Sequence, residues 1–209
     1  MAISFIGAAS GITSATLPAH SVGDIILGLA FRDGNTTPPT IDASFTTIDN
    51  SAGANSCSLA AGYMVADSAS EVSGTWSSAT SVIFLVYSGV DTADPIGGLT
   101  QTGGSSTTVA YNGITMDVGD GTSTVIGFAG HRSTNTSLET PPTGMSLVST
   151  AADATDEAAA HSAPAATSWS TQSVSVGGTS SGWRSLVFEL KAAVASTGNA
   201  RHGMLMGMG

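Results

Sequence analysis

Positive charge is the property that this sequence has least of. Lysine and arginine together number 5 against 15 aspartates and glutamates, so the net charge is -10. The field around such a protein repels the phosphates of nucleic acids and the headgroups of anionic lipids. We therefore expect neither a nucleic acid nor a membrane surface among its partners.

Cysteine and long apolar runs are scarce as well. Cys57 is the single cysteine, so the chain cannot form an internal disulfide, and we expect this thiol to be a small buried core residue. No apolar run approaches the ~20 residues that span a bilayer. Residues 1–10 lack the basic and the long apolar stretches of a secretory signal. If the protein works outside a cell, we therefore expect it to leave by a route other than a cleaved signal, such as cell lysis.

Side chains that could carry out a reaction are not arranged for one. Nucleophilic catalysis needs a serine or cysteine beside an oriented base, and a metal site needs convergent ligands. The chain has no G-x-S-x-G elbow on a strand-to-helix turn and no H-x-x-x-H or C-x-x-C spacing, and its histidines stand in unrelated contexts. We expect no catalytic residue, no cofactor and no enzymatic activity.

Two features leave alternatives open. Asp117 and Asp120 lie in a D-x-G-D-G segment that is similar to a calcium loop but lacks the closing glutamate of an EF-hand, so a plain turn between strands is favoured over calcium binding. The tryptophans could stack on a sugar, although core packing is favoured for them. They are Trp76, Trp169 and Trp183.

The apolar residues that are present, 41% of the chain, fall in short runs rich in β-branched side chains, which indicates an all-β fold. Residues 8–14 and 91–106 are predicted to be a turn and a long crossing, and the Asn112-Gly113 pair predicts a hairpin. The predicted strands are residues 2–6, 23–32, 45–48, 58–66, 81–90, 107–111, 114–118, 124–132, 145–148, 158–166 and 183–190.

The second half of the chain repeats the landmarks of the first at an offset of about 100 residues. Each half has a buried strand that ends in arginine, then a Pro-Pro pair, then further strands in the same order. Half a chain with strands that are apolar on both faces has too little cover to be stable alone, so the halves should share one core. We predict an antiparallel, jelly-roll-like β-sandwich of pseudo-duplicated halves, residues 1–95 and 105–191, in one domain over residues 1–191.

Arg32 and Arg132 end the two repeated strands in a chain that is nearly devoid of cations. We expect both guanidinium groups to bind carboxylates or loop carbonyls at the rim of the sandwich. A binding role for them is the alternative.

Residues 192–209 break the pattern and form a linker followed by a Met/Gly-rich tail. Methionine and leucine are costly to expose to water and adapt to irregular grooves. We expect this tail to dock on a partner or on a neighbouring copy. The predicted partner-binding residues are Arg201, His202, Met204, Leu205, Met206 and Met208.

Several segments carry a resemblance to a known family. They are TPPTIDASFTTI at 37–48, GYMVADSAS at 62–70, TWSSATSVIFLVYSGVDTADPIG at 75–97, TPPTGMSLV at 140–148 and GWRSLVFELKA at 182–192. The chain resembles a β-sandwich family found in bacteriophage virion proteins and bacterial surface proteins. It departs from the family at Phe45, where a tryptophan is usual, and at residues 70–72, where the family has a Glu-Pro turn.

The resemblance implies a setting rather than a reaction, because its motifs mark strands and turns. It implies a noncatalytic virion component that is assembled in the host cytoplasm, either a capsid decoration or a tail-associated protein. Its expected partners are other virion proteins and further copies of itself, and the expected oligomer is a trimer. The alternative is a carbohydrate-binding module that attaches to a glycan on the host surface.

Overall fold

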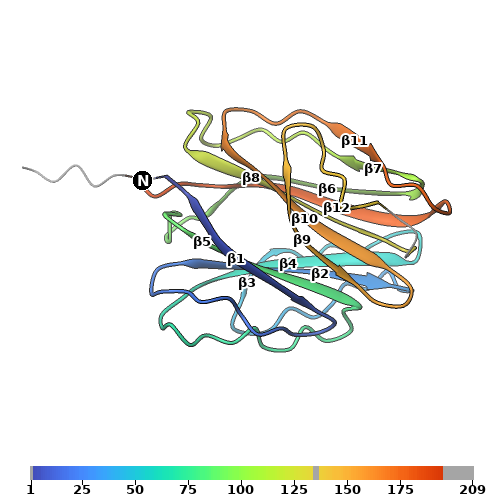
Figure 1. Ribbon diagram of the computed structural model, residues 1–209, viewed down its shortest axis with the longest axis horizontal. Helices are drawn as coiled ribbons and strands as arrows, with labels where there is room; N and C mark the ends of the chain where they lie inside the picture. The colour runs from blue at the N-terminus through green and yellow to red at the C-terminus, as the bar shows by residue number, and fades with distance from the viewer. Residues whose placement is uncertain (1, 134–136, 195–209) are drawn as a thin grey trace, which may run out of the picture.

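The computed structural model describes residues 2–133 and 137–194, and within these ranges the protein consists of strands and loops. No helix in the described ranges has the length and hydrophobicity needed to cross a membrane. Two five-stranded antiparallel sheets pack face to face, as the two layers of Figure 1 show. The predicted β-sandwich is thus confirmed.

Each half of the chain forms one of the two sheets. The first sheet has the order β1-β5-β2-β4-β3 and is made of β1 (Ser4–Gly11), β2 (Ile25–Asp33), β3 (Thr46–Asp49), β4 (Cys57–Val65) and β5 (Ser81–Ser88). The second has the order β6-β12-β8-β10-β9 and is made of β6 (Ile96–Ser106), β8 (Ser123–His131), β9 (Ser146–Ala152), β10 (Glu157–Ala166) and β12 (Ser181–Leu190). A two-stranded sheet pairs β7 (Thr108–Tyr111) with β11 (Gln172–Ser175).

The two sheets have the same topology, strand for strand. Replacing β1, β5, β2, β4 and β3 by β6, β12, β8, β10 and β9 reproduces the second order from the first. Contacts between the sheets are reciprocal, because β4 packs on β12 while β10 packs on β5. This reciprocity is the arrangement that a pseudo-two-fold axis between the sheets produces, and it confirms the pseudo-duplicated halves.

The central strands are apolar throughout because both of their faces are buried. Successive side chains of a strand point to opposite faces. On the inner face, Leu27 and Phe31 of β2 belong to the same core cluster as Phe128 of β8. The outer face of the first sheet is covered by loops that include Trp76, and that of the second sheet by β7, β11 and neighbouring loops. Three apolar layers therefore enclose the two sheets.

Three local predictions are wrong. The strand β1 continues to Gly11, through most of the predicted turn, because it pairs along its length with β5. The predicted crossing contains β6, an edge strand of small residues on which Gly103 and Gly104 leave room for the side chains of Arg184 and Trp183. The strand β7 pairs with β11 instead of with residues 114–118, because its apolar side chains cover the second sheet together with those of β11.

Candidate functional site

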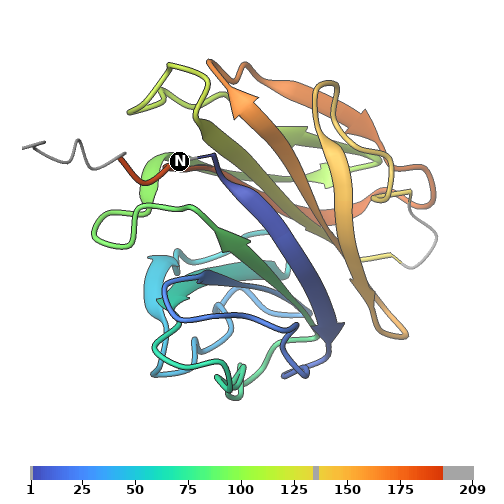
Figure 2. The ribbon, with the colours of Figure 1, turned by 60° about the vertical axis from the view of Figure 1, so that its left-hand side comes forward.

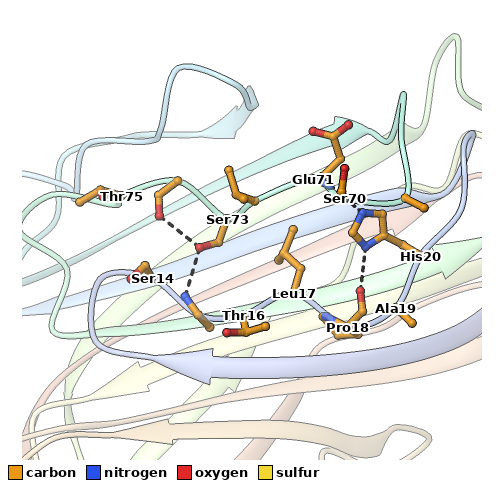
Figure 3. A pocket seen from close by; sticks show the side chains of 14 residues that line it. Ser14, Thr16, Leu17, Pro18, Ala19, His20, Ser70, Glu71, Ser73 and Thr75 are labelled. Carbon is orange, nitrogen blue, oxygen red and sulfur yellow. Dashed lines mark hydrogen bonds between the residues drawn. The ribbon is translucent and has the colours of Figure 1, made fainter.

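A groove of about 720 Å³ lies on the outside of the first sheet, between two extended segments, residues 14–20 and 69–75 (Figure 3). Leu17, Pro18 and the exposed Val72 form its apolar surface. The polar side chains that line it are Ser14, Thr16, His20, Ser70, Glu71, Ser73 and Thr75.

The segments that bound the groove occupy the places that β7 and β11 occupy in the second half. In the first half, the Trp76 amide donates to the Thr13 carbonyl at 2.8 Å, and in the second the Val176 amide donates to the Thr107 carbonyl at 2.8 Å. Beyond this shared bond the halves differ, because β7 and β11 pair over four consecutive residues each. The described residues of the first half form no such ladder, and the groove lies where it would be.

Side chains hold the two segments of the groove apart. The Ala15 amide donates to the Ser73 hydroxyl at 3.1 Å, and the Glu71 amide donates to His20 Nε2 at 3.1 Å. As Figure 3 shows, the Ser73 hydroxyl lies between the two backbones at one end of the groove and the His20 ring lies between them at the other. The groove therefore widens from Trp76 toward His20.

The contacts of His20 determine its tautomer. Its Nδ1 lies 2.7 Å from the Pro18 carbonyl oxygen, which can only accept, so Nδ1 carries the proton and donates. Its Nε2 accepts from the Glu71 amide, so the ring is neutral. Both ring nitrogens are engaged with backbone, and neither is available to take a proton from the neighbouring hydroxyls. The arrangement suits binding rather than proton transfer.

The wide end of the groove carries negative charge. A hydrogen bond between the Asp67 and Glu71 carboxyls raises the pKa of Asp67 and lowers the pKa of Glu71. Glu71 Oε1 also accepts from the Ser68 amide at 3.1 Å and from its hydroxyl at 2.9 Å. Arg32 is the only lysine or arginine in residues 1–131. Among residues 2–133 and 137–194, no lysine or arginine forms an ion pair with either of these two carboxyl groups.

The rim and core predictions are confirmed. Arg32 Nη1 donates to the Thr37 carbonyl at 3.0 Å, and Arg132 forms an ion pair with Asp33. Cys57 is fully buried, and burial raises the pKa of its thiol to about 12. The two arginines therefore stabilise loops at the rim, and the thiol lies in the core.

The tryptophans do not form a sugar-stacking surface, so that alternative is wrong. Trp76, Trp169 and Trp183 are buried, with none more than 8% exposed. Trp76 Nε1 donates to the Ser73 carbonyl at 3.2 Å, and Trp183 Nε1 donates to the Ser106 hydroxyl at 3.1 Å. Apolar packing around them explains their burial.

The two aspartates of the predicted turn serve different contacts. Asp120 Oδ1 accepts from the Thr122 amide at 2.9 Å and from its hydroxyl at 2.6 Å, and Asp117 Oδ2 lies 3.7 Å from Lys191 Nζ. Across residues 2–133 and 137–194, no cluster of three or more His, Cys, Asp or Glu side chains could hold a metal ion.

The six predicted residues of the tail, from Arg201 to Met208, lie outside the described residues.

Two buried groups on or beside β10 have perturbed pKa values. Burial raises the pKa of Asp156 from its ordinary 3.8 to about 6, although Ser81 Oγ donates to its Oδ1 at 2.5 Å. Burial lowers the pKa of His161 from 6.5 to about 4, and His161 Nδ1 lies 3.3 Å from the Tyr111 hydroxyl. Neither group lines the groove, and burial accounts for both shifts.

These two groups give opposite pH dependences to the free energy of unfolding. The folded protein holds the Asp156 proton up to about pH 6, whereas the unfolded chain releases it near 3.8, so this contribution to stability falls as the pH rises. The unfolded chain protonates His161 near pH 6.5, whereas the folded protein does so only near 4, so this contribution falls as the pH drops. Together they nearly cancel.

Removing either group should reveal the pH dependence that the other group gives to the free energy of unfolding. In Asp156→Asn we expect the free energy of unfolding to rise by roughly 2–3 kcal/mol between pH 4.5 and 7, and in His161→Gln to fall by roughly the same amount. Urea denaturation across this range is the measurement. Slopes of the same sign in the two variants would contradict the assignment.

The residues of the groove were not singled out from the sequence. In the sequence, Thr16, Leu17 and Pro18 indicate only an edge segment, because proline cannot donate to a central ladder, and residues 68–73 indicate only a polar link. The signal that could have found them is the comparison of residues 14–17 with β7, but β11, the strand that pairs with β7, was not predicted either.

Neither a scan against protein-family models nor searches of curated proteins and of solved structures found a match to this chain.

Proposed function

We propose that this protein is a noncatalytic structural component of bacteriophage particles, a capsid decoration or tail-associated protein that acts by contacts with other proteins. The resemblance of its motifs to virion β-sandwiches suggests the setting. The observation that supports contact-based action is the composition of the sheet edges. Edge strands of isolated proteins are usually protected by charged residues or proline.

Three of the four edge strands lack this protection. The edges of the two sheets are β1, β3, β6 and β9, and only β3 contains a charged residue, Asp49. None of the four contains proline. Uncharged edges with free backbone groups are templates for pairing with another chain.

The two sides of the sandwich differ. On the side of β3 and β6, a polar contact connects the sheets, because Gln101 Nε2 of β6 donates to Asp49 Oδ2 of β3 at 2.6 Å. Within the second sheet, Arg184 of β12 donates to the same Gln101 side chain. On the other side β1 packs beside β9 (Figure 2), and Phe5, Ile6 and Leu147 are exposed there. We propose the side of β1 and β9 as the contact surface, with further copies of this chain among its partners.

A charge placed on this surface should disrupt assembly. Ile6 is the extra residue of a β-bulge in β1 and is 43% exposed, so Ile6→Lys should leave the core intact. We expect it to weaken self-association about tenfold or more, because pairing would bury an unpaired ammonium group. Light scattering on a size-exclusion column, with the trimer as the expected species, and recovery of the protein in gradient-purified phage particles are the measurements.

Leu99→Lys on β6 is the matched control, because Leu99 is 47% exposed and lies on the opposite side. It should leave the mass and the recovery unchanged. A wild-type protein that is monomeric at micromolar concentration and absent from purified particles would refute the proposed function. Equal losses of self-association in Ile6→Lys and Leu99→Lys would refute the proposed surface.

A further inference from the structure

We propose that the groove between residues 14–20 and 69–75 binds the C-terminal segment of the same chain, residues 201–208, in an extended conformation. The shape of the groove is the first reason. In the described part of the chain, the backbone groups of Thr16, Leu17 and Val72 have no hydrogen-bond partner, although their counterparts in β7 and β11 pair with one another. Unpaired extended backbone binds a further extended segment through main-chain hydrogen bonds.

Charge complementarity is the second reason. Of the five lysines and arginines of the chain, four have partners within the sandwich. The fifth is Arg201, which stands at the start of the segment RHGMLMGMG. The carboxyl pair of Asp67 and Glu71 at the wide end of the groove is the acidic counterpart that a guanidinium group binds through two hydrogen bonds.

The apolar residues of the segment match the rest of the groove. Met204, Leu205 and Met206 are unbranched or flexible apolar side chains that adapt to an irregular surface, here one made of Leu17, Pro18 and Val72. The glycines of the segment allow its backbone to approach closely. Val72 is 71% exposed, so an occupant would cover apolar area that is now in water.

The described chain ends at the same end of the first sheet as the wide end of the groove. The Ala193 amide donates to the Gly89 carbonyl at 2.9 Å, one residue beyond the end of β5. At this end of the first sheet, Tyr87 of β5 pairs with Ile25 of β2. The Ala66 amide donates to the carbonyl of Asp24, the residue before Ile25, and Ala66 begins the link that leads to Glu71. Figure 1 shows the end of β12 beside the start of β1.

The linker between Val194 and Arg201 is long enough to span several strands of the first sheet. Seven residues lead from Val194 to Arg201, and an extended chain of this length reaches roughly 23–25 Å. Neighbouring strands lie about 4.8 Å apart, so this reach exceeds the width of the strands β1, β5 and β2.

Disulfide trapping in the full-length chain tests the proposal. Val72→Cys combined with Met206→Cys should form a disulfide within one chain on mild oxidation, detected by mass spectrometry of proteolytic fragments. Gln172→Cys combined with Met206→Cys is the matched control, because Gln172 of β11 is the counterpart of Val72 in the second half. We expect at least a tenfold higher yield from the first pair.

Two further variants test the charge contact. Glu71→Gln and Arg201→Ala should each reduce the trapping yield severalfold, and the two together should reduce it no further than either alone, as expected for a direct pair. Equal yields from the groove pair and the control pair would overturn the proposal. A disulfide that joins two chains would also overturn it and would assign the groove to the tail of a neighbouring copy.

Discussion

Replacing Trp76 with alanine is expected to lower the free energy of unfolding by about 3–5 kcal/mol. The indole is fully buried on the outer face of the first sheet and meets the rings of Phe45 and Phe84 edge-on at centroid distances of 5.2 Å and 6.0 Å. It lies against Gly28, where an added Cβ would stand 2.2 Å from its Cζ2. Its removal leaves a cavity that the rigid sheet beneath it cannot close.

Chemical denaturation of Trp76→Ala and Trp76→Phe measures this contribution. The phenylalanine variant keeps a ring but loses the hydrogen bond to the Ser73 carbonyl, so its loss should be about half as large. Trp76 also holds residues 73–76 in place, so the alanine variant should weaken the binding of any segment in the groove. A loss below about 1.5 kcal/mol would contradict the structural role of the indole.

Replacing Glu189 with alanine is expected to cost about 3–5 kcal/mol as well, because three hydrogen bonds to its carboxylate are lost. Its fully buried carboxylate accepts from the Asp117 amide at 2.6 Å, the Val118 amide at 3.0 Å and the Ser123 hydroxyl at 2.6 Å. Alanine would leave the buried Ser123 hydroxyl and the two partly buried loop amides without this partner, and each unmade bond costs about 1–3 kcal/mol.

The effect of Glu189 should be local to the second half. The corresponding position in the first half is Val86, which pairs with Ile26 of β2 as Glu189 pairs with Val125 of β8. The link between the segment at 14–17 and β2 is also shorter than the link between β7 and β8. The carboxylate therefore holds a loop that is longer in the second half than in the first. Hydrogen exchange should show faster exchange at Asp117 and Val118 in Glu189→Ala.

Controls separate the carboxylate from the loss of charge in general. Glu139→Ala removes an exposed carboxylate from a loop and should change the free energy of unfolding by less than about 0.5 kcal/mol. Glu189→Gln keeps the size of the side chain and one acceptor oxygen, so its loss in the free energy of unfolding should lie between those of Glu139→Ala and Glu189→Ala. If Glu189→Ala unfolded at the same denaturant concentration as Glu139→Ala, the three hydrogen bonds would contribute no net stability.

The pseudo-duplicated sandwich could be predicted from the sequence because it depends on local composition and on order. Strands such as β2 and β8 are apolar on both faces, and such a strand requires cover on both sides, whatever its neighbours are. The recurrence of these strands at one spacing indicated a repeated unit. The rim contacts of Arg32 and Arg132 followed from the same pattern, whereas the burial of Cys57 followed from the behaviour of a single cysteine as a small apolar residue.

Only the tertiary structure decided the edge strand β6, the pairing of β7 with β11, and the groove. The glycines and threonines of β6 carry no hydrophobic pattern, so its strand conformation depends on pairing with β12. The strands β7 and β11 lie about 60 residues apart, and the sheet beneath brings them together. The groove exists because Ser73 and His20 separate two segments whose counterparts pair directly, a difference that appears only when the two halves are superposed in space.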